Sequence, residues 1–330
     1  MAKQPSYTVW TIAVDGELYA PPSMAPDGTI YVGGTDDVLY ALRPNGSVVF
    51  TRRIERSTFF IPFSTPTVGP DGTIYIGCRD WTLRSFHPNG DAAMVYHVDE
   101  AVRTGPLLAE DGTLYFGTGN AFYAYDHYDN LLWTRKFERL IYPLPVLTGD
   151  GRLLFTDGRH KLYCLNTMDG TTRWEFKVEG FISDYPMALP DGRVVITCHS
   201  AGENLLYILN ANGEIGKVFS LSEWQPYTPV LGPDGTLYVA SFSGYVYAIN
   251  NEGKSQWKFR VPLSFPPAMT VDPAGTLLIG GLDGYLYAIG RDGDFLWKYD
   301  IGSPIHAAPL IGPGGRIYVS TVDGILYALD

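Results

Sequence analysis

Four side chains that lie far apart in the sequence have the types needed for acid–base chemistry. Asp184 and His306 could form a carboxylate–imidazole pair that moves protons, because histidine changes its charge near neutral pH. Tyr142 and Arg103 could bind and polarise an oxygen atom of a ligand held between that pair. Each of the four could instead be a solvated loop residue. Their chemistry depends on whether the fold brings them together.

Motifs of the common hydrolases, nucleotide-binding proteins and metalloproteins are absent from the sequence. Cys198, His199 and His160 do not follow the ligand spacing of a zinc site. The chain has no Gly-x-Ser-x-Gly motif, no phosphate-binding loop and no His-Glu-x-x-His motif. We therefore expect no metal ion and no cofactor.

A repeat of about 41 residues supplies the elements that must position these side chains. Each copy begins with a turn of the Pro-Asp-Gly type, whose glycine recurs at Gly28, Gly72, Gly112, Gly151, Gly192, Gly235, Gly275 and Gly315. A motif such as LYAL at 39–42 or VYAI at 246–249 follows each turn. In most copies an Asn-Gly, Asp-Gly or Glu-Gly pair comes next, often with a Trp four residues on.

The composition of the repeat predicts β-strands. Tyr, Val, Ile, Leu and Thr dominate each run, and Gly, Pro, Asn and Asp separate the runs. Asn-Gly is typical of short hairpins, and Pro-Asp-Gly suits a tight turn. Each repeat therefore holds four short antiparallel strands, which is one blade of a β-propeller.

The two ends of the sequence predict how the ring closes. The last repeat stops at Asp330 without its fourth strand, whereas residues 7–18 resemble a fourth strand without its repeat. We expect residues 7–18 to complete the blade formed by 305–330, which covers an edge that would otherwise aggregate. The prediction is an all-β fold: one eight-bladed propeller domain spanning 1–330, present as a monomer.

The order of strands within a blade divides the loops between two faces. The regular first and third turns lie on one face, and the irregular second turns and blade-to-blade connections lie on the other. The irregular face carries aromatic side chains that could line a funnel for a ligand: Phe60, Phe63, Tyr185, Trp224, Tyr227 and Phe265. These rings could alternatively plug the central channel or pack between blades. A site is favoured because regular packing would repeat one residue type around the ring.

Composition and charge exclude several classes of protein. The net charge is −11 and the pI is about 5.0, which argues against nucleic acid as a partner. No apolar run is long enough to span a membrane, and MAKQPSYTVW has no apolar core of a signal peptide. The three cysteines fit a reducing compartment. We expect a cytoplasmic protein, provided that no export signal has been removed.

The segment from Leu286 to Trp297, LYAI-x-x-x-G-x-x-x-W, resembles the repeat of the pyrroloquinoline quinone (PQQ) propeller family. The resemblance covers the whole chain and implies an eight-bladed ring. Members include quinoprotein dehydrogenases and outer-membrane assembly lipoproteins. The dehydrogenases stack the quinone between a Trp and a disulfide of adjacent cysteines over Ca²⁺, and the lipoproteins need an N-terminal signal with a lipidated Cys. This sequence matches neither feature, so neither function carries over.

Two functions remain open from the sequence. The first is a binding protein whose aromatic funnel holds a small organic molecule or a partner peptide. The second is a cofactor-free enzyme, a lyase, cyclase or hydrolase, that uses Asp184, His306, Tyr142 and Arg103 in the same funnel. A deep pocket with convergent polar groups would favour the enzyme, and a shallow apolar face would favour the binding protein.

Overall fold

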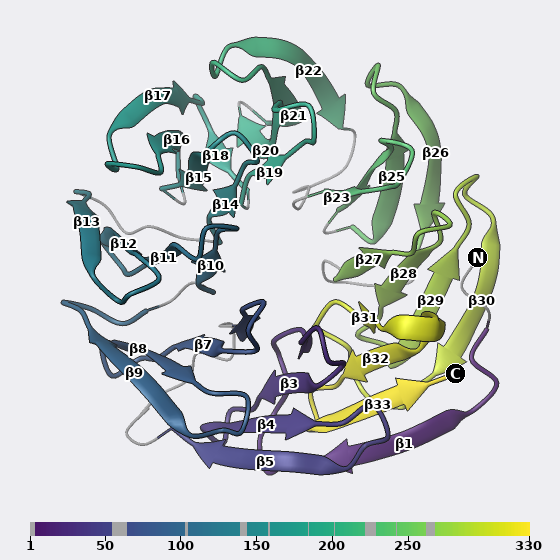
Figure 1. Cartoon of the computed structure of the whole chain (residues 1–330). Coiled ribbons are helices and arrows are strands. Elements are labelled where there is room, and N and C mark those ends of the chain that lie inside the picture. The colour runs from purple at the N-terminus through teal and green to yellow at the C-terminus, as the bar shows by residue number, and fades with distance from the viewer. Residues whose placement is uncertain are drawn as a thin grey trace.

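The computed structural model describes residues 4–330 except 55–64, 103–104, 139–143, 158, 184, 201, 222–228, 242 and 262–267. The described residues form β-strands joined by turns, with one three-residue 3-10 turn, η1 (Pro313–Gly315). No helix among them is long and apolar enough to cross a membrane. Eight antiparallel sheets surround a common centre, as Figure 1 shows, so the predicted eight-bladed propeller is confirmed.

The strands of each blade follow in chain order from the centre of the ring outward, except that the N-terminal strand completes blade 8. Blade 1 contains β2 (Ser23–Met24), β3 (Ile30–Gly33), β4 (Val38–Leu42) and β5 (Val48–Arg53); blade 2 contains β6 (Thr67–Val68), β7 (Ile74–Gly77), β8 (Thr82–Phe86) and β9 (Ala92–His97); blade 3 contains β10 (Leu107–Leu108), β11 (Leu114–Gly117), β12 (Ala121–Tyr125) and β13 (Leu131–Lys136); blade 4 contains β14 (Val146–Leu147), β15 (Arg152–Thr156), β16 (Lys161–Asn166) and β17 (Thr172–Lys177).

The second half of the ring has the same order. Blade 5 contains β18 (Phe181–Ile182), β19 (Met187–Ala188), β20 (Val194–Ser200), β21 (Glu203–Leu209) and β22 (Ile215–Leu221); blade 6 contains β23 (Val230–Leu231), β24 (Leu237–Ala240), β25 (Tyr245–Ile249) and β26 (Ser255–Arg260); blade 7 contains β27 (Met269–Val271), β28 (Leu277–Gly280), β29 (Tyr285–Ile289) and β30 (Phe295–Asp300); blade 8 contains β31 (Leu310–Ile311), β32 (Ile317–Ser320), β33 (Ile325–Leu329) and β1 (Thr8–Ala13). Blade 5 differs because both β18 and β19 pair with β20.

The N-terminal strand closes the ring, as predicted. β1 pairs antiparallel with β33, from Thr8 opposite Leu329 to Ala13 opposite Ile325. Figure 1 shows β1 on the outer rim beside β33. The Asp330 side chain accepts from Nε and Nη2 of Arg316 at 2.7 and 2.5 Å, and Nη1 of Arg316 donates to the Pro44 carbonyl of blade 1 at 2.9 Å. The last blade is therefore bound both to the first strand of the chain and to blade 1.

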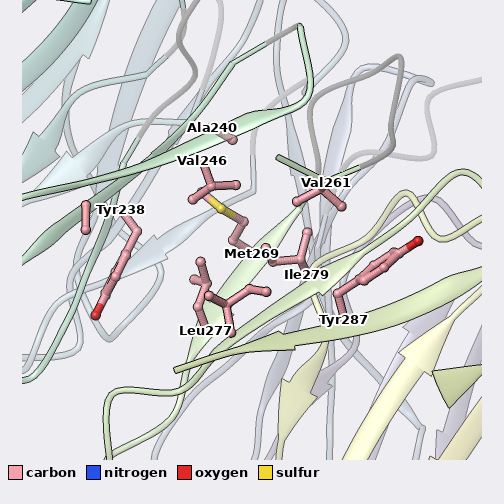
Figure 2. Packing of buried hydrophobic residues seen from close by; sticks show 10 residues of the cluster. Tyr238, Ala240, Val246, Val261, Met269, Leu277, Ile279 and Tyr287 are labelled. Atoms are coloured by element: carbon pink, nitrogen blue, oxygen red, sulfur yellow. The ribbon is translucent and has the colours of Figure 1, made fainter. Parts of the chain in front are cut away.

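The hydrophobic core lies between the blades. The described residues contain eight buried clusters, and each cluster draws on two consecutive blades. Figure 2 shows the cluster between blades 6 and 7, where Tyr238 and Val246 face Leu277, Ile279 and Tyr287. Strands alternate their side chains between two faces, and both faces of every blade are covered by a neighbour. This explains why the strands are apolar on both sides.

A ring-on-glycine contact joins most neighbouring blades. An aromatic ring from the fourth strand of one blade packs on the third-turn glycine of the next blade in six pairs: Trp10 with Gly46, Phe50 with Gly90, Trp133 with Gly170, Trp174 with Gly213, Phe219 with Gly253 and Trp257 with Gly293. The indole Nε1 atoms of Trp10, Trp133, Trp174 and Trp257 also donate to carbonyls of the same turns at 2.7–2.9 Å. The recurring Gly and Trp of the sequence therefore form one repeated contact.

The junction between blades 2 and 3 is built differently. Met94 occupies the position of the ring in blade 2, opposite Ser85, just as Trp133 lies opposite Ala124 in blade 3. Asp129, with a left-handed φ of 64°, occupies the place of the glycine in the third turn of blade 3. The phenol of Tyr96 donates a hydrogen bond to Asp129 across this junction. At this junction the buried Tyr96 ring, edge-on to Tyr125 of blade 3, and its hydrogen bond to Asp129 take the place of the ring-on-glycine contact.

Candidate functional site

The loops divide between two faces as the sequence predicts. In every blade the strands follow one another in antiparallel order. The second turns and the blade-to-blade connections therefore share one face, which we call the connection face; the first and third turns form the opposite turn face. Backbone hydrogen bonds join the two kinds of loop: the amide of Val102 donates to Cys78 at 3.0 Å, and that of Ile305 donates to Gly281 at 3.0 Å.

Two of the ten predicted site residues, His306 and Tyr185, lie among the described residues. His306 belongs to the connection between blades 7 and 8, and Tyr185 follows β18 in blade 5, where its side chain is half-buried. The other eight lie outside the described residues: Asp184, Tyr142, Arg103, Phe60, Phe63, Trp224, Tyr227 and Phe265. The convergence of the complete set stays a prediction.

His306 contacts an aromatic ring that comes from the next connection. The imidazole meets the ring of Tyr19 edge-on, with ring centroids 5.4 Å apart. Partial burial lowers the pKa of His306 below its usual 6.5, which favours the neutral imidazole, a form that can both donate and accept a hydrogen bond. Partial burial, followed by the neighbouring Glu17 carboxylate, raises the pKa of the Tyr19 phenol. The lowered pKa of His306 and the raised pKa of Tyr19 both favour the uncharged side chain, and each ring carries polar atoms at its edge.

The carboxylates of the second turns are engaged within their own blades. The phenol of Tyr40 donates to Asp36 at 2.5 Å, and that of Tyr287 donates to Asp283. In blade 2, Arg84 replaces this tyrosine and forms a 2.5 Å ion pair with Asp80. The departure of Arg84 from the repeat, visible in the sequence, therefore preserves a turn-closing contact.

A second ring pair lies on the connection face in blades 4 and 5. The His160 ring packs against Phe181 with centroids 5.0 Å apart, and His160 Nδ1 hydrogen-bonds with the Gly180 carbonyl. Phe181 is 56% exposed, and Trp81 on the second turn of blade 2 is 59% exposed. The described residues hold no group of three or more potential metal ligands.

Exposed rings and large apolar side chains also occur on the turn face. Tyr128 and Met168, on the third turns of blades 3 and 4, are 73% and 84% exposed. Hollows of about 570 and 540 Å³ lie between first turns of blades 5 to 7 and of blades 4 and 5. Sequence reasoning assigned no site to this face, because its turns are nearly identical from blade to blade. Exposed large side chains occur on both faces, so exposure alone does not identify the face that binds a ligand.

The three cysteine thiols are buried and free. Burial raises the pKa of Cys78 to about 12 and those of Cys164 and Cys198 to about 11. Each thiol is therefore protonated at pH 7, in a form that is neither a nucleophile nor a metal ligand. The thiols fill core space between blades.

A family model described as outer membrane protein assembly factor BamB, of the PQQ-like repeat type, matches residues 118–242 and 242–330. The chain belongs to this PQQ-like propeller repeat family. The resemblance of its LYAI and Trp motifs to that repeat is thereby confirmed. No curated protein matches the chain.

Solved structures share the fold at low identity. BamB from Moraxella catarrhalis is 15% identical, with a TM-score of 0.75 over 98% of this chain and 99% of the other. The computationally designed Ika8 protein is 12% identical, with a TM-score of 0.76 over 96% and 98% of the two chains. The Dos1 propeller is 11% identical, with a TM-score of 0.76 over 97% and 93%. At these identities the likeness concerns the fold alone, and a shared fold does not establish a shared function.

Proposed function

We propose that this propeller is a binding protein that holds a partner peptide or a small organic molecule on its connection face. The observation that carries the proposal is the contact between Tyr19 and His306, because it joins two successive blade-to-blade connections. Residues that meet across connections can contact one ligand together. The family description, an assembly factor, also supports a protein that holds partners.

The chemistry of the pair suits a neutral hydrogen-bonding group. A neutral imidazole can donate to a carbonyl oxygen or accept from an amide, and the phenol ring offers an apolar face. Phe181 and Trp81 add exposed rings on the same face in other blades. A peptide, with alternating amides and side chains, uses both kinds of contact. An extended peptide is therefore the ligand that this surface fits best.

The enzymatic alternative gains no support from the described residues. It requires Asp184, Tyr142 and Arg103, all outside the described residues. The described second-turn carboxylates Asp36, Asp80 and Asp283 are bound to a Tyr or Arg of their own blade. We therefore place the enzyme second.

The experiment is native mass spectrometry of the purified chain, alone and after incubation with a random decapeptide library. We expect bound species on the wild type, and a reduced bound fraction for His306→Ala and Tyr19→Ala. Tyr128→Ala is the matched control, because it removes an exposed ring from the turn face and should leave binding unchanged.

Two results would contradict the proposal. One is a chain that carries no bound species and retains no peptide from the library. The other is loss of binding in Tyr128→Ala with full binding in His306→Ala. If the chain bound a small molecule but no peptide, the proposed site would stand, and its ligand would be a small organic molecule.

A further inference from the structure

A charged crevice of about 540 Å³ lies between blades 3 and 4, outside the predicted funnel. Phe137, which follows β13, and Tyr163 of β16 form its apolar wall, with their rings edge-on at 5.4 Å. Both rings are half-buried, and the Lys161 ammonium lies over the Tyr163 ring, 5.5 Å from its centroid. Figure 1 shows β13 and β17 as the outer strands of neighbouring blades, which places the crevice toward the rim.

Two lysines stand opposite each other beside this wall. Lys161 of β16 and Lys177 of β17 are direct cross-strand partners. Like charges in directly opposed positions repel each other and destabilise a sheet. The equivalent pair in the other seven blades never places two lysines or arginines together: it is Val38–Arg53, Thr82–His97, Ala121–Lys136, Leu205–Ser220, Tyr245–Arg260, Tyr285–Asp300 and Ile325–Ala13. Among these equivalent positions, only blade 4 places two basic residues directly opposite each other.

Nearby acids compensate this charge only in part. Glu175 binds Lys161 at 2.8 Å, which leaves Lys177 without an ion pair among the described residues. The Asp157 carboxylate accepts the backbone amides of Arg159, His160 and Lys161 at 2.8–2.9 Å, so it closes the turn.

The remaining charged groups are arranged around the same crevice. The Arg135 guanidinium lies over Phe137 at 5.2 Å and donates to the Gly170 carbonyl at 2.7 Å. Lys136 Nζ forms an ion pair with Asp99 Oδ2 at 2.8 Å, and Glu138 is exposed. The lining holds four basic and three acidic residues, a formal charge of +1, in a chain of net charge −11.

We propose that this crevice is a binding site for a small aromatic carboxylate. The carboxylate accepts from Lys177 and Lys161 and relieves their repulsion, and the ring of the ligand packs on Phe137 and Tyr163. The proposal is independent of the function proposed for the connection-face pair Tyr19 and His306, because it uses other residues in other blades.

The test is isothermal titration calorimetry with benzoate, with benzamide as the uncharged analogue and inorganic phosphate as an anion without a ring. We expect millimolar binding of benzoate by the wild type, no binding of benzamide, and weaker binding of phosphate. In about 1 M NaCl, where screening shortens the range of exposed charges to about 3 Å, the benzoate affinity should fall.

The informative variant is Lys177→Gln, with Arg260→Gln as its matched control. Arg260 occupies the equivalent position in blade 6 opposite Tyr245 and carries the same charge. Lys177→Gln should weaken benzoate binding by about tenfold and leave the unfolding temperature unchanged or raised, because it removes a repulsion. Arg260→Gln should bind benzoate as the wild type does.

Each possible result either supports or contradicts the proposed site. Equal binding of benzoate and benzamide, absence of benzoate binding, or phosphate binding without benzoate binding would each overturn the proposed site. A Lys177→Gln variant that binds benzoate normally would do the same. If Lys177→Gln lowered the unfolding temperature as well as the affinity, the lysine would be a structural residue and the proposal would fail.

Discussion

The ring-on-glycine contact predicts a specific stability loss for Gly170→Ala. Gly170 has a left-handed φ of 69°, and a Cβ atom built there would lie 2.7 Å from Cε3 and 2.9 Å from Cδ2 of Trp133. Trp133 is 8% exposed, and its Nε1 donates to the Thr167 carbonyl at 2.8 Å. The indole is held on both sides, so it has little freedom to move away from the new methyl group.

Two costs contribute to the expected loss. A left-handed conformation costs alanine about 1 kcal/mol relative to glycine. Overpacking against a fixed ring adds about 1–3 kcal/mol. The expected total is therefore about 2–4 kcal/mol in the free energy of unfolding.

Gly314→Ala is the matched control for the backbone cost. Gly314 has a similar φ of 75°, and beyond the glycine and its two chain neighbours no heavy atom lies within 4 Å of the position its Cβ would take. This variant should lose about 1 kcal/mol, so the difference between the two variants isolates the contact with Trp133. Equilibrium urea unfolding followed by circular dichroism measures both losses.

A double-mutant cycle with Trp133→Ala completes the test. Without the indole, the methyl group of Gly170→Ala has space, and its cost should fall to that of Gly314→Ala. The reasoning is refuted if Gly170→Ala and Gly314→Ala lose the same free energy, or if the cost of Gly170→Ala is unchanged in the Trp133→Ala background.

Three further predictions concern closure, charge and the thiols. Removing residues 1–18 takes β1 from β33 and exposes a strand edge, so gel filtration should show oligomers or aggregates; a soluble monomer of unchanged stability would count against the closure. Hydrogen bonding from Arg316 lowers the pKa of Asp330 below its usual 3.8, so this pair stabilises the fold above about pH 4 and the gain is lost as the pH falls through the lowered pKa. Arg316→Gln should therefore reduce the free energy of unfolding by about 1 kcal/mol near pH 7 and by less near pH 3, and an equal loss at both pH values in urea titrations would contradict this. Burial and raised pKa values should keep all three native thiols unreactive toward a disulfide reagent at about pH 8 while all react in urea, and fast reaction of the native protein would disprove their placement.

The fold was predictable because its signal is repeated. Turn glycines such as Gly28, with a φ of 87°, recur at nearly constant spacing, and each copy reports the same four strands. The pairing of residues 7–18 with the last blade followed from matching the two ends of the sequence. The sequence also showed that Arg84 departs from the repeat. Only the structure shows that its guanidinium forms an ion pair with Asp80.

The candidate sites were less predictable because they lie where the repeat is broken. A residue in a blade-to-blade connection, such as His306, has no repeated neighbour that fixes its direction, and its contact with Tyr19 joins positions 287 apart in the sequence. The opposed pair Lys161 and Lys177 is invisible until the strand register is known, because lysines sixteen residues apart carry no pattern. Sequence reasoning therefore identified the two faces of the propeller, but not which side chains contact one another.

The junction between blades 2 and 3 joins its blades through a different pair of residues from the six ring-on-glycine junctions. The buried Tyr96 ring lies edge-on to Tyr125 of blade 3, and its phenol donates to Asp129. Converting this junction to the common contact would therefore need two coordinated changes, an aromatic ring at Met94 and a glycine at Asp129. Either change alone would leave a ring without its glycine or a glycine without its ring.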